Sequence, residues 1–255
     1  MTDTPWWPAL YDDLLAEVLL TRDESDPHTE LTLHFLIDQL GLAPGARVLD
    51  QCCGIGSLSL ALARRGFRVI GVDQSRAYIE QARKAAESAE ISLDLRAADA
   101  SVFVPREPVD GVFNWWTSFG YADTDAENIR MLARAFEALK PDGVFLLDVM
   151  NLPGVLRGFQ RDVVVRRETS RGQVMLLRES SLDLAGGYMK KRWTYFLPDQ
   201  SRVEHESRTP FYLPHQILQM LRSVGFVDFS LFSGPDAAPL TLDSLRLIIR
   251  ARRPA

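Results

Sequence analysis

The sequence predicts an α/β fold: a seven-stranded, mostly parallel, doubly wound sheet with an antiparallel last strand, N-terminal helices and an inserted antiparallel β-meander. Two observations lead to this prediction. Between residues 46 and 150, short apolar runs alternate with longer runs of helical spacing, the pattern of βαβ crossovers. Between residues 161 and 212, four strand-like runs follow one another with only turn residues between them.

Two helices are expected ahead of the core, at about 8–20 and 29–40. The polar segment 21–28 separates them, and Pro27 is expected to end any helical tendency there. Trp6 and Trp7 either anchor the first helix by hydrophobic contact or belong to an arm that folds over a ligand and excludes water.

The core elements follow from the length and spacing of the runs. The apolar runs have strand length and are too continuous for a half-exposed sheet, so we expect strands covered on both faces. These strands are predicted at 46–50, 68–73, 91–99, 109–116 and 143–150. The helices between them are predicted at 56–66, 75–89 and 127–140. The sequence LKPDG is expected to form the turn before the last of these strands.

After the core, the strand-like runs of the meander are 162–170, 173–184, 188–197 and 202–213. A helix at 213–226 and strands at 227–233 and 244–253 complete the chain. Because the link between these two strands is too short for a helical crossover, the final strand should run antiparallel to its neighbour.

These elements suggest three parts. We expect an N-terminal helical cap over 1–42, a ligand-binding core over 43–155 and 213–255, and an inserted β subdomain over 156–212. The subdomain is expected to act as a lid, as the surface of a homodimer, or as both. Its segment 157–192 holds nine basic and four acidic side chains. That excess indicates a solvated sheet face or, alternatively, attraction of an acidic substrate.

Composition narrows the function classes. The chain is 46% hydrophobic and 25% charged, with a net charge of -5, which argues against a strong nucleic-acid binder. The start lacks the features of a signal peptide, and no apolar run has the length of a membrane helix, so we expect a cytoplasmic protein without a membrane partner. Cys52 and Cys53 are adjacent and lack metal-site spacing, so no metal or disulfide is expected.

Acidic residues end three successive strands of the predicted core. Asp50, Asp73 and Asp99 hold these positions, Asn114 ends the fourth strand, and a glycine-rich turn, GIG, follows the first. Each aspartate alone is explained as a turn or helix-capping residue. Together they lie at the carboxyl ends of parallel strands, where ligands bind in such sheets.

The acids favour a cationic nucleoside over a dinucleotide. The turn nearly matches the fingerprint of dinucleotide enzymes, so NAD is the alternative. Asp50, however, would face the pyrophosphate, which is better served by backbone NH groups. The ligand indicated has ribose hydroxyls for Asp73, an adenine amino group for Asp99 and a positive tail near Asp50.

These motifs resemble the class I (Rossmann-like) S-adenosylmethionine-dependent methyltransferase family, of the type that acts on small molecules. VLDQCCGIG resembles the first motif, with Cys52 where the first glycine usually stands. VIGVDQS resembles the second motif, AADA the acid that meets adenine, and DGVFNWWTSFGY the fourth-strand segment. The resemblance covers about residues 46–150 by motif and most of the rest by strand order.

The resemblance implies S-adenosyl-L-methionine as cofactor and assigns expected roles. Asp50 would orient the methionine ammonium, and Asn114 would hold it from the other side. Gly56 would permit close helix packing. The other expected cofactor contacts are Tyr11 near the cofactor, Cys52 and Gly54 beside the methionine part, Asp73 at the ribose, and Gln74, Asp99 and Ala100 at the adenine.

The segment NWWTSFGY is expected to form the acceptor wall, with Trp115, Trp116 and Tyr121 as substrate-binding residues. At least one of the adjacent tryptophans must instead belong to the core, because neighbours in an extended chain point opposite ways. The catalytic residue stays unassigned. The candidate bases are His28, His34, His205, His215, Tyr121, Glu204 and Glu206, with His205 the first to test.

The sequence therefore predicts a methyltransferase that acts on an O, N or C atom of a small metabolite. One alternative keeps the cofactor and changes the acceptor to a protein or RNA. Another is a protein that binds the cofactor without catalysis.

Overall fold

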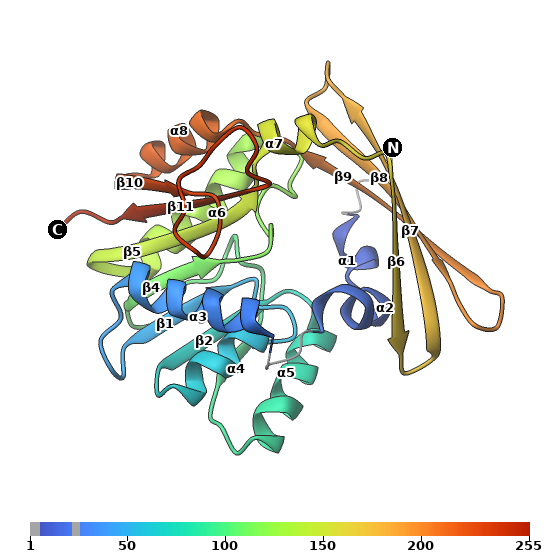
Figure 1. The fold of residues 1–255 in the computed structure, drawn as a ribbon. Helices are drawn as coiled ribbons and strands as arrows, with labels where there is room; N and C mark the ends of the chain where they lie inside the picture. The colour runs from blue at the N-terminus through green and yellow to red at the C-terminus, as the bar shows by residue number, and fades with distance from the viewer. Residues whose placement is uncertain (1–5, 22–25) are drawn as a thin grey trace.

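The fold was analysed in a computed structural model that describes residues 6–21 and 26–255. Seven strands form one sheet in the order β10-β11-β5-β4-β1-β2-β3 (Figure 1). They are β1 (Arg47–Gln51), β2 (Arg68–Asp73), β3 (Asp94–Ala97), β4 (Val109–Asn114), β5 (Leu139–Met150), β10 (Val227–Phe232) and β11 (Arg246–Arg252). β3, β2, β1, β4 and β5 pair in parallel, and β11 runs antiparallel to both β5 and β10. The predicted fold class, including the antiparallel last strand, is confirmed.

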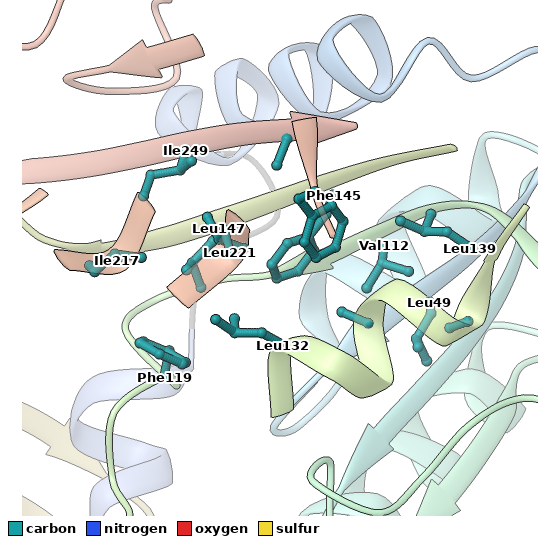
Figure 2. Close-up of a cluster of buried hydrophobic side chains, with 14 of the residues drawn as sticks. Leu49, Val112, Phe119, Leu132, Leu139, Phe145, Leu147, Ile217, Leu221 and Ile249 are labelled. Atoms are coloured by element: carbon teal, nitrogen blue, oxygen red, sulfur yellow. The ribbon is translucent and has the colours of Figure 1, made fainter. Parts of the chain in front are cut away.

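Helices cover both faces of this sheet. One face packs against α3 (Pro27–Leu40), α4 (Ser57–Arg64) and α5 (Arg76–Ser88), and the other against α6 (Asp125–Ala138) and α8 (Pro214–Val224). Successive strand residues point to opposite faces, so Val48 packs in the first layer and Leu49 in the second. Figure 2 shows the second layer, where Phe145 and Leu147 meet Leu132. Burial on both faces explains why these strands read as continuous apolar runs.

Two local features differ from the predicted core. The LKPDG segment is part of β5 rather than a separate turn, and a register shift between Val109 and Gly111 accommodates it. Asp142 has a φ of 63° there, so the chain does bend within the strand. In addition, α7 (Leu152–Arg157) follows β5, a short helix that the periodicity did not indicate.

The predicted single helix at 8–20 is wrong, because the segment is broken. α1 (Trp7–Leu10) ends at Tyr11, and α2 (Asp13–Leu15) then runs into the π-helix η1 (Ala16–Leu20). The break occurs at Asp12, whose carboxylate accepts a hydrogen bond from the Leu15 N–H and thereby caps a new helix.

Pro27 also acts differently from the prediction. It starts α3 at its first position, where the missing N–H costs nothing, after Asp26 caps the helix. Of the polar segment between the helices, residues 22–25 lie outside the described residues. None of the described helices is both long and apolar enough to cross a membrane.

The inserted strands form a second, four-stranded antiparallel sheet in the order β6-β7-β8-β9. They are β6 (Asp162–Thr169), β7 (Gly172–Asp183), β8 (Tyr188–Phe196) and β9 (Arg202–Pro210). The N-terminal helices lie between the two sheets (Figure 1). Leu14 and Val18 pack there against Leu176, Trp193 and Tyr195, which come from one face of the second sheet.

Asp12 links these three parts of the molecule. Its carboxylate lies 3.2 Å from His205 Nε2 on β9, and its backbone oxygen accepts a hydrogen bond from the Tyr78 hydroxyl on α5 (2.8 Å). The helices between the sheets are therefore fixed to both sides.

Gly56 is expected to be required for the packing of α4 against α5. It has a φ of 80°, and a Cβ there would lie 2.9 Å from Ala82 Cβ. Gly56→Ala should lower the free energy of unfolding by about 2–4 kcal/mol, the sum of backbone strain and overpacking. Gly66→Ala is the matched control, because Gly66 has a φ of 86° and open space around it. Equal losses in urea unfolding for the two variants would contradict the packing explanation.

Candidate functional site

The turn after β1 has a backbone conformation that favours glycine. Cys52, Gly54 and Gly56 have φ values of 67°, 56° and 80°, all in the left-handed region. Gly54 and Gly56 adopt it freely, whereas Cys52 carries a Cβ and pays about 1–2 kcal/mol for it. Cys52 and Cys53 are both free thiols, and burial raises the pKa of each.

A polar cavity of about 560 Å³ opens beside this turn, at the carboxyl ends of β1 and β2 and next to α6. It brings together seven residues that the sequence singled out: Tyr11, Cys52, Asp73, Gln74, Asp99, Ala100 and Tyr121. The residues that follow strands come together because parallel strands present their carboxyl ends at the same edge, and the N-terminal helices bring Tyr11 to them.

Asp73 and Asp99, the two acids at strand ends that line the polar cavity, are held by backbone donors. Asp73 accepts from the Gly54 N–H (2.9 Å) and the Ser75 N–H (2.8 Å), and Asp99 accepts from the Ser101 N–H (2.7 Å). Burial raises the pKa of Asp73, and these two N–H groups oppose the rise. Both carboxylates keep acceptor capacity for a ligand.

Three of the expected residues do not line the polar cavity and lie directly behind it: Asp50, Gly54 and Asn114. Asp50 is 3% exposed and accepts from Ser59 Oγ at 2.6 Å. Burial raises its pKa to about 7 despite that hydrogen bond, with the charge of Asp73 adding to the rise. Asp50 is therefore a carboxyl group that titrates near neutral pH.

Asn114 is fully buried at the end of β4. Its Nδ2 lies 3.7 Å from Cys52 Sγ and 3.6 Å from Met131 Sδ, and both of those residues line the polar cavity. Its Oδ1 accepts no hydrogen bond from the described residues. An unpaired buried acceptor costs about 1–3 kcal/mol, which a ligand carrying an N–H donor would recover.

A second, apolar cavity of about 370 Å³ lies between the seven-stranded sheet and the inner face of the four-stranded sheet. Trp116 and Tyr121 line it, as expected of the acceptor wall. Trp115 does not, which corrects its assignment as a substrate contact. It is 4% exposed and packs against Phe35 of α3, with ring centroids 6.1 Å apart. The side chains of adjacent residues diverge, so one tryptophan serves the core and the other the cavity.

Tyr11 and Tyr121 line both cavities and form the boundary between them. Their hydroxyls are hydrogen-bonded to each other, and Tyr121 donates to the Thr117 carbonyl oxygen at 2.6 Å. Since the single hydroxyl proton of Tyr121 is used in that bond, Tyr11 is the donor to Tyr121. Burial raises the pKa of Tyr11 and raises that of Tyr121 to about 12. Both tyrosines are therefore neutral at physiological pH.

The loop after β4 holds Trp116 and Thr117 in the left-handed region, at φ values of 57° and 62°. Asp148 fixes this conformation: its carboxylate accepts from the Trp116 N–H (2.9 Å), and its carbonyl oxygen accepts from the Thr117 N–H (3.0 Å). Arg246 of β11 binds both carboxylate oxygens of Asp148 and donates to Thr117 Oγ1 (2.9 Å). A buried ion pair thus places the boundary between the cavities.

The candidate bases lie away from the cavities' meeting point, apart from Tyr121. His205 is held by Asp12 and stacks edge-on with Tyr195, and none of the four histidines lines the polar or the apolar cavity. His28, His34, His215, Glu204 and Glu206 are exposed. The catalytic residue stays unassigned.

Several residues of the polar cavity were not among the expected cofactor contacts. Trp6 and Trp7 line it, and Trp7 Nε1 donates to Gln74 Oε1 at 2.9 Å, which corresponds to the arm weighed as an alternative to simple anchoring. Met131 of α6 and Ser101 also line it, and no motif or spacing marked them. Within the described residues, no group of three or more His, Cys, Asp or Glu side chains is arranged to hold a metal ion.

Comparisons with known proteins agree with this geometry. Residues 48–143 match a family described as "Methyltransferase domain". Over 117 residues the chain is 38% identical to the S-adenosyl-L-methionine-dependent Diels-Alderase iccD of Talaromyces variabilis. The aligned segment covers 44% of this chain and 39% of that protein. It is 32% identical over 115 residues to a ubiquinone biosynthesis O-methyltransferase of Bradyrhizobium diazoefficiens, 45% of this chain and 44% of that protein. The matched part is thus less than half the length of either relative.

The fold as a whole also has solved counterparts. An S-adenosylmethionine-dependent methyltransferase from Clostridium acetobutylicum superposes with a TM-score of 0.77, covering 98% of this chain and all of that one, at 15% identity. Identity at that level shows a shared fold, including the inserted sheet within the covered length. Residues 48–143 thus match a methyltransferase domain, and the chain as a whole shares its fold with solved S-adenosylmethionine-dependent methyltransferases.

Proposed function

We propose that the chain is an S-adenosylmethionine-dependent methyltransferase that transfers a methyl group to an O, N or C atom of a small metabolite. The observation that carries this proposal is the pair of cavities that meet at Tyr11 and Tyr121. One is polar and lined by acids, and the other is apolar and has a volume typical of a site for a small molecule.

The negative charge and the hydrogen-bond acceptors of the polar cavity suit the cofactor. Asp73 and Asp99 offer acceptors for ribose hydroxyls and for the adenine amino group, and Ala100 lies beside Asp99. Asp50 and the unpaired Asn114 Oδ1 lie behind the turn, where a cationic ammonium group would be stabilised directly or through water. A pyrophosphate would meet the same carboxylates with repulsion.

The apolar cavity would hold the acceptor. The cofactor supplies an activated methyl group on a sulfonium, so the protein has to align the reactants and exclude water. Trp116 and Phe119 provide apolar walls, and the neutral hydroxyls of Tyr11 and Tyr121 lie at the junction where the methyl group would pass. The N-terminal helices close the junction from the side of the second sheet.

Two observations favour a small acceptor over RNA or a protein. The net charge is -5, and on the outer face of the second sheet several basic side chains are paired with acids, such as Lys190 with Asp183 at 3.1 Å. An alternative without methyl transfer also has support, because the Talaromyces relative is described as an S-adenosyl-L-methionine-dependent Diels-Alderase. A protein of that kind would bind S-adenosylmethionine and release no S-adenosylhomocysteine.

The central test measures S-adenosylmethionine affinity by calorimetry and S-adenosylhomocysteine release with a pool of small metabolites. Asp73→Ala and Asp99→Ala should each weaken cofactor binding about 10- to 100-fold, because each removes hydrogen bonds to a charged acceptor. Asp94→Ala is the control, since Asp94 starts β3 at the opposite edge of the sheet and is ion-paired with Arg96. Unchanged affinity in both variants would refute the cofactor site, and binding without release would favour the non-catalytic alternative.

The raised pKa of Asp50 leads us to expect that cofactor binding releases a proton. Its pKa of about 7, raised mainly by burial from 3.8, leaves roughly half of the free protein protonated at pH 7. A cationic ligand favours the carboxylate, so binding should release up to about 0.5 proton at pH 7 and much less at pH 9. Calorimetry in buffers of different ionisation enthalpy measures this number. Asp50→Asn should abolish the release, and a release that persists in that variant would come from another group.

The same group makes the free protein less stable as pH rises. Between 3.8 and about 7 only the folded state holds the proton, so the contribution of Asp50 to stability falls across that window.

Cys52 is expected to contribute through its backbone and not through its thiol. Cys52→Gly removes the strain of the left-handed φ and should leave S-adenosylmethionine affinity within about threefold. Cys52→Val puts a β-branched side chain at a φ of 67° and should lower the free energy of unfolding by about 2 kcal/mol. A large loss of cofactor affinity in the glycine variant would instead show that the thiol itself takes part.

A further inference from the structure

Two cations lie on the wall of the apolar cavity opposite the seven-stranded sheet. They are Arg178 of β7 and Lys191 of β8. Arg178 is paired across the strands with Trp193, and Lys191 precedes Trp193 by two residues, so the three side chains share the inner face. On β8 the sequence itself contains this alternation, since Lys191, Trp193 and Tyr195 have the same parity.

Neither cation is paired with an acid in the part of the chain that the structure describes. Among residues 6–21 and 26–255, no carboxylate forms an ion pair with Arg178 or Lys191, and Arg178 Nε is buried without a hydrogen-bond acceptor. The basic neighbours on the outer face differ: Lys190 is paired with Asp183, and Arg192 lies 3.9 Å from both Glu179 and Glu206. Arg246, the third cation on the cavity wall, is bound by Asp148.

Both cations lie against the ring of Trp193. The guanidinium carbon of Arg178 is 5.4 Å and the ammonium nitrogen of Lys191 is 5.8 Å from the ring centroid. The indole is fixed in turn by the bond from Nε1 to Ser207 Oγ at 2.9 Å. Cation–π attraction keeps the charges in place but does not cancel them.

The surroundings of the two cations disfavour their charged forms. Burial lowers the pKa of Arg178, and burial together with the charge of Arg178 lowers the pKa of Lys191 to about 8. Lys191 is still mostly protonated at pH 7. The free protein therefore keeps two like charges close together in a half-buried site, and an anion there would relieve their repulsion.

We infer that Arg178 and Lys191 bind the carboxylate of an otherwise apolar acceptor. The inference rests on the proposed function and specifies its substrate class: an acid whose anionic end faces the second sheet. The opposite wall, formed by Phe119, Val149 and Ile217, is apolar and accommodates the body of such a molecule. A guanidinium binds a carboxylate through two parallel N–H bonds, and the ammonium adds a third donor.

The experiment compares two probes of nearly equal shape, 2-naphthoate and 2-naphthamide, by calorimetry on the full chain saturated with S-adenosylhomocysteine. The naphthoate should bind at least about tenfold more tightly than the neutral amide. Arg178→Met and Lys191→Met should each remove most of that preference and leave the amide affinity within about twofold. Lys190→Met and Arg192→Met are the matched controls, because they remove adjacent cations from the outer face of the same strand, and they should keep the preference.

A second readout separates ligand binding from a structural role. Because Arg178→Met and Lys191→Met each remove one of two repelling charges, their melting temperatures without ligand should equal or exceed that of the parent chain. A clear fall in melting temperature would assign the pair to the fold instead and overturn the inference.

Three results of the probe experiment would also overturn it: no binding of naphthoate, equal affinity for both probes, or a preference that survives both substitutions. Binding of S-adenosylhomocysteine to the parent chain separates failure of the substrate class from failure of the proposed function. If it binds and the acid preference is absent, only the substrate class fails. If it does not bind, the proposed function fails with it.

Discussion

The ion pair between Asp148 and Arg246 is the interaction on which the geometry of the site depends. Asp148 is 2% exposed, and three groups converge on it: the Trp116 N–H, the Thr117 N–H and the guanidinium of the antiparallel last strand. These bonds stabilise two successive left-handed residues that would otherwise relax. Removing Arg246 would leave the buried carboxylate of Asp148 uncompensated, at a cost below the roughly 3–5 kcal/mol typical of fully buried pairs, because Arg246 is 30% exposed.

The ion pair thereby positions residues that line both cavities. The loop that Asp148 holds carries Tyr121, which donates to Thr117 and receives the hydroxyl of Tyr11. Tyr11 in turn belongs to the N-terminal segment that Asp12 fixes between α5 and β9. A strand near the end of the chain and a helix near its start therefore position the same boundary, which explains how elements far apart in sequence build one junction.

Much of the core followed from local patterns. The continuous apolar strands, the acids at their ends and the glycine turn predicted the mostly parallel sheet and the edge where Asp73 and Asp99 meet, because parallel strands present their carboxyl ends at one edge. The alternation in β8 also contained the inward orientation of Lys191. Whether the lining residues of the polar cavity contact the cofactor stays a prediction.

The failures had tertiary causes. The helix at 8–20 is broken at Asp12, which caps a new helix through the Leu15 N–H and also bonds to His205, a partner 193 residues away that periodicity does not reveal. Trp115 and Trp116 were indistinguishable in sequence, since the face that each takes depends on the loop held by Asp148. NWWTSFGY indicated one wall of the apolar cavity, but the opposite wall comes from a separate sheet, so no single segment could indicate the cavity as a whole.

The position of residues 6–20 has an evolutionary consequence. Without them, Leu176, Trp193 and Tyr195 would form part of a water-exposed apolar surface on the second sheet, of the kind that drives aggregation. The inserted sheet and the amino-terminal helices thus depend on each other to bury this surface. A related chain without the amino-terminal helices would need polar residues on the uncovered sheet face, or another polypeptide to cover it.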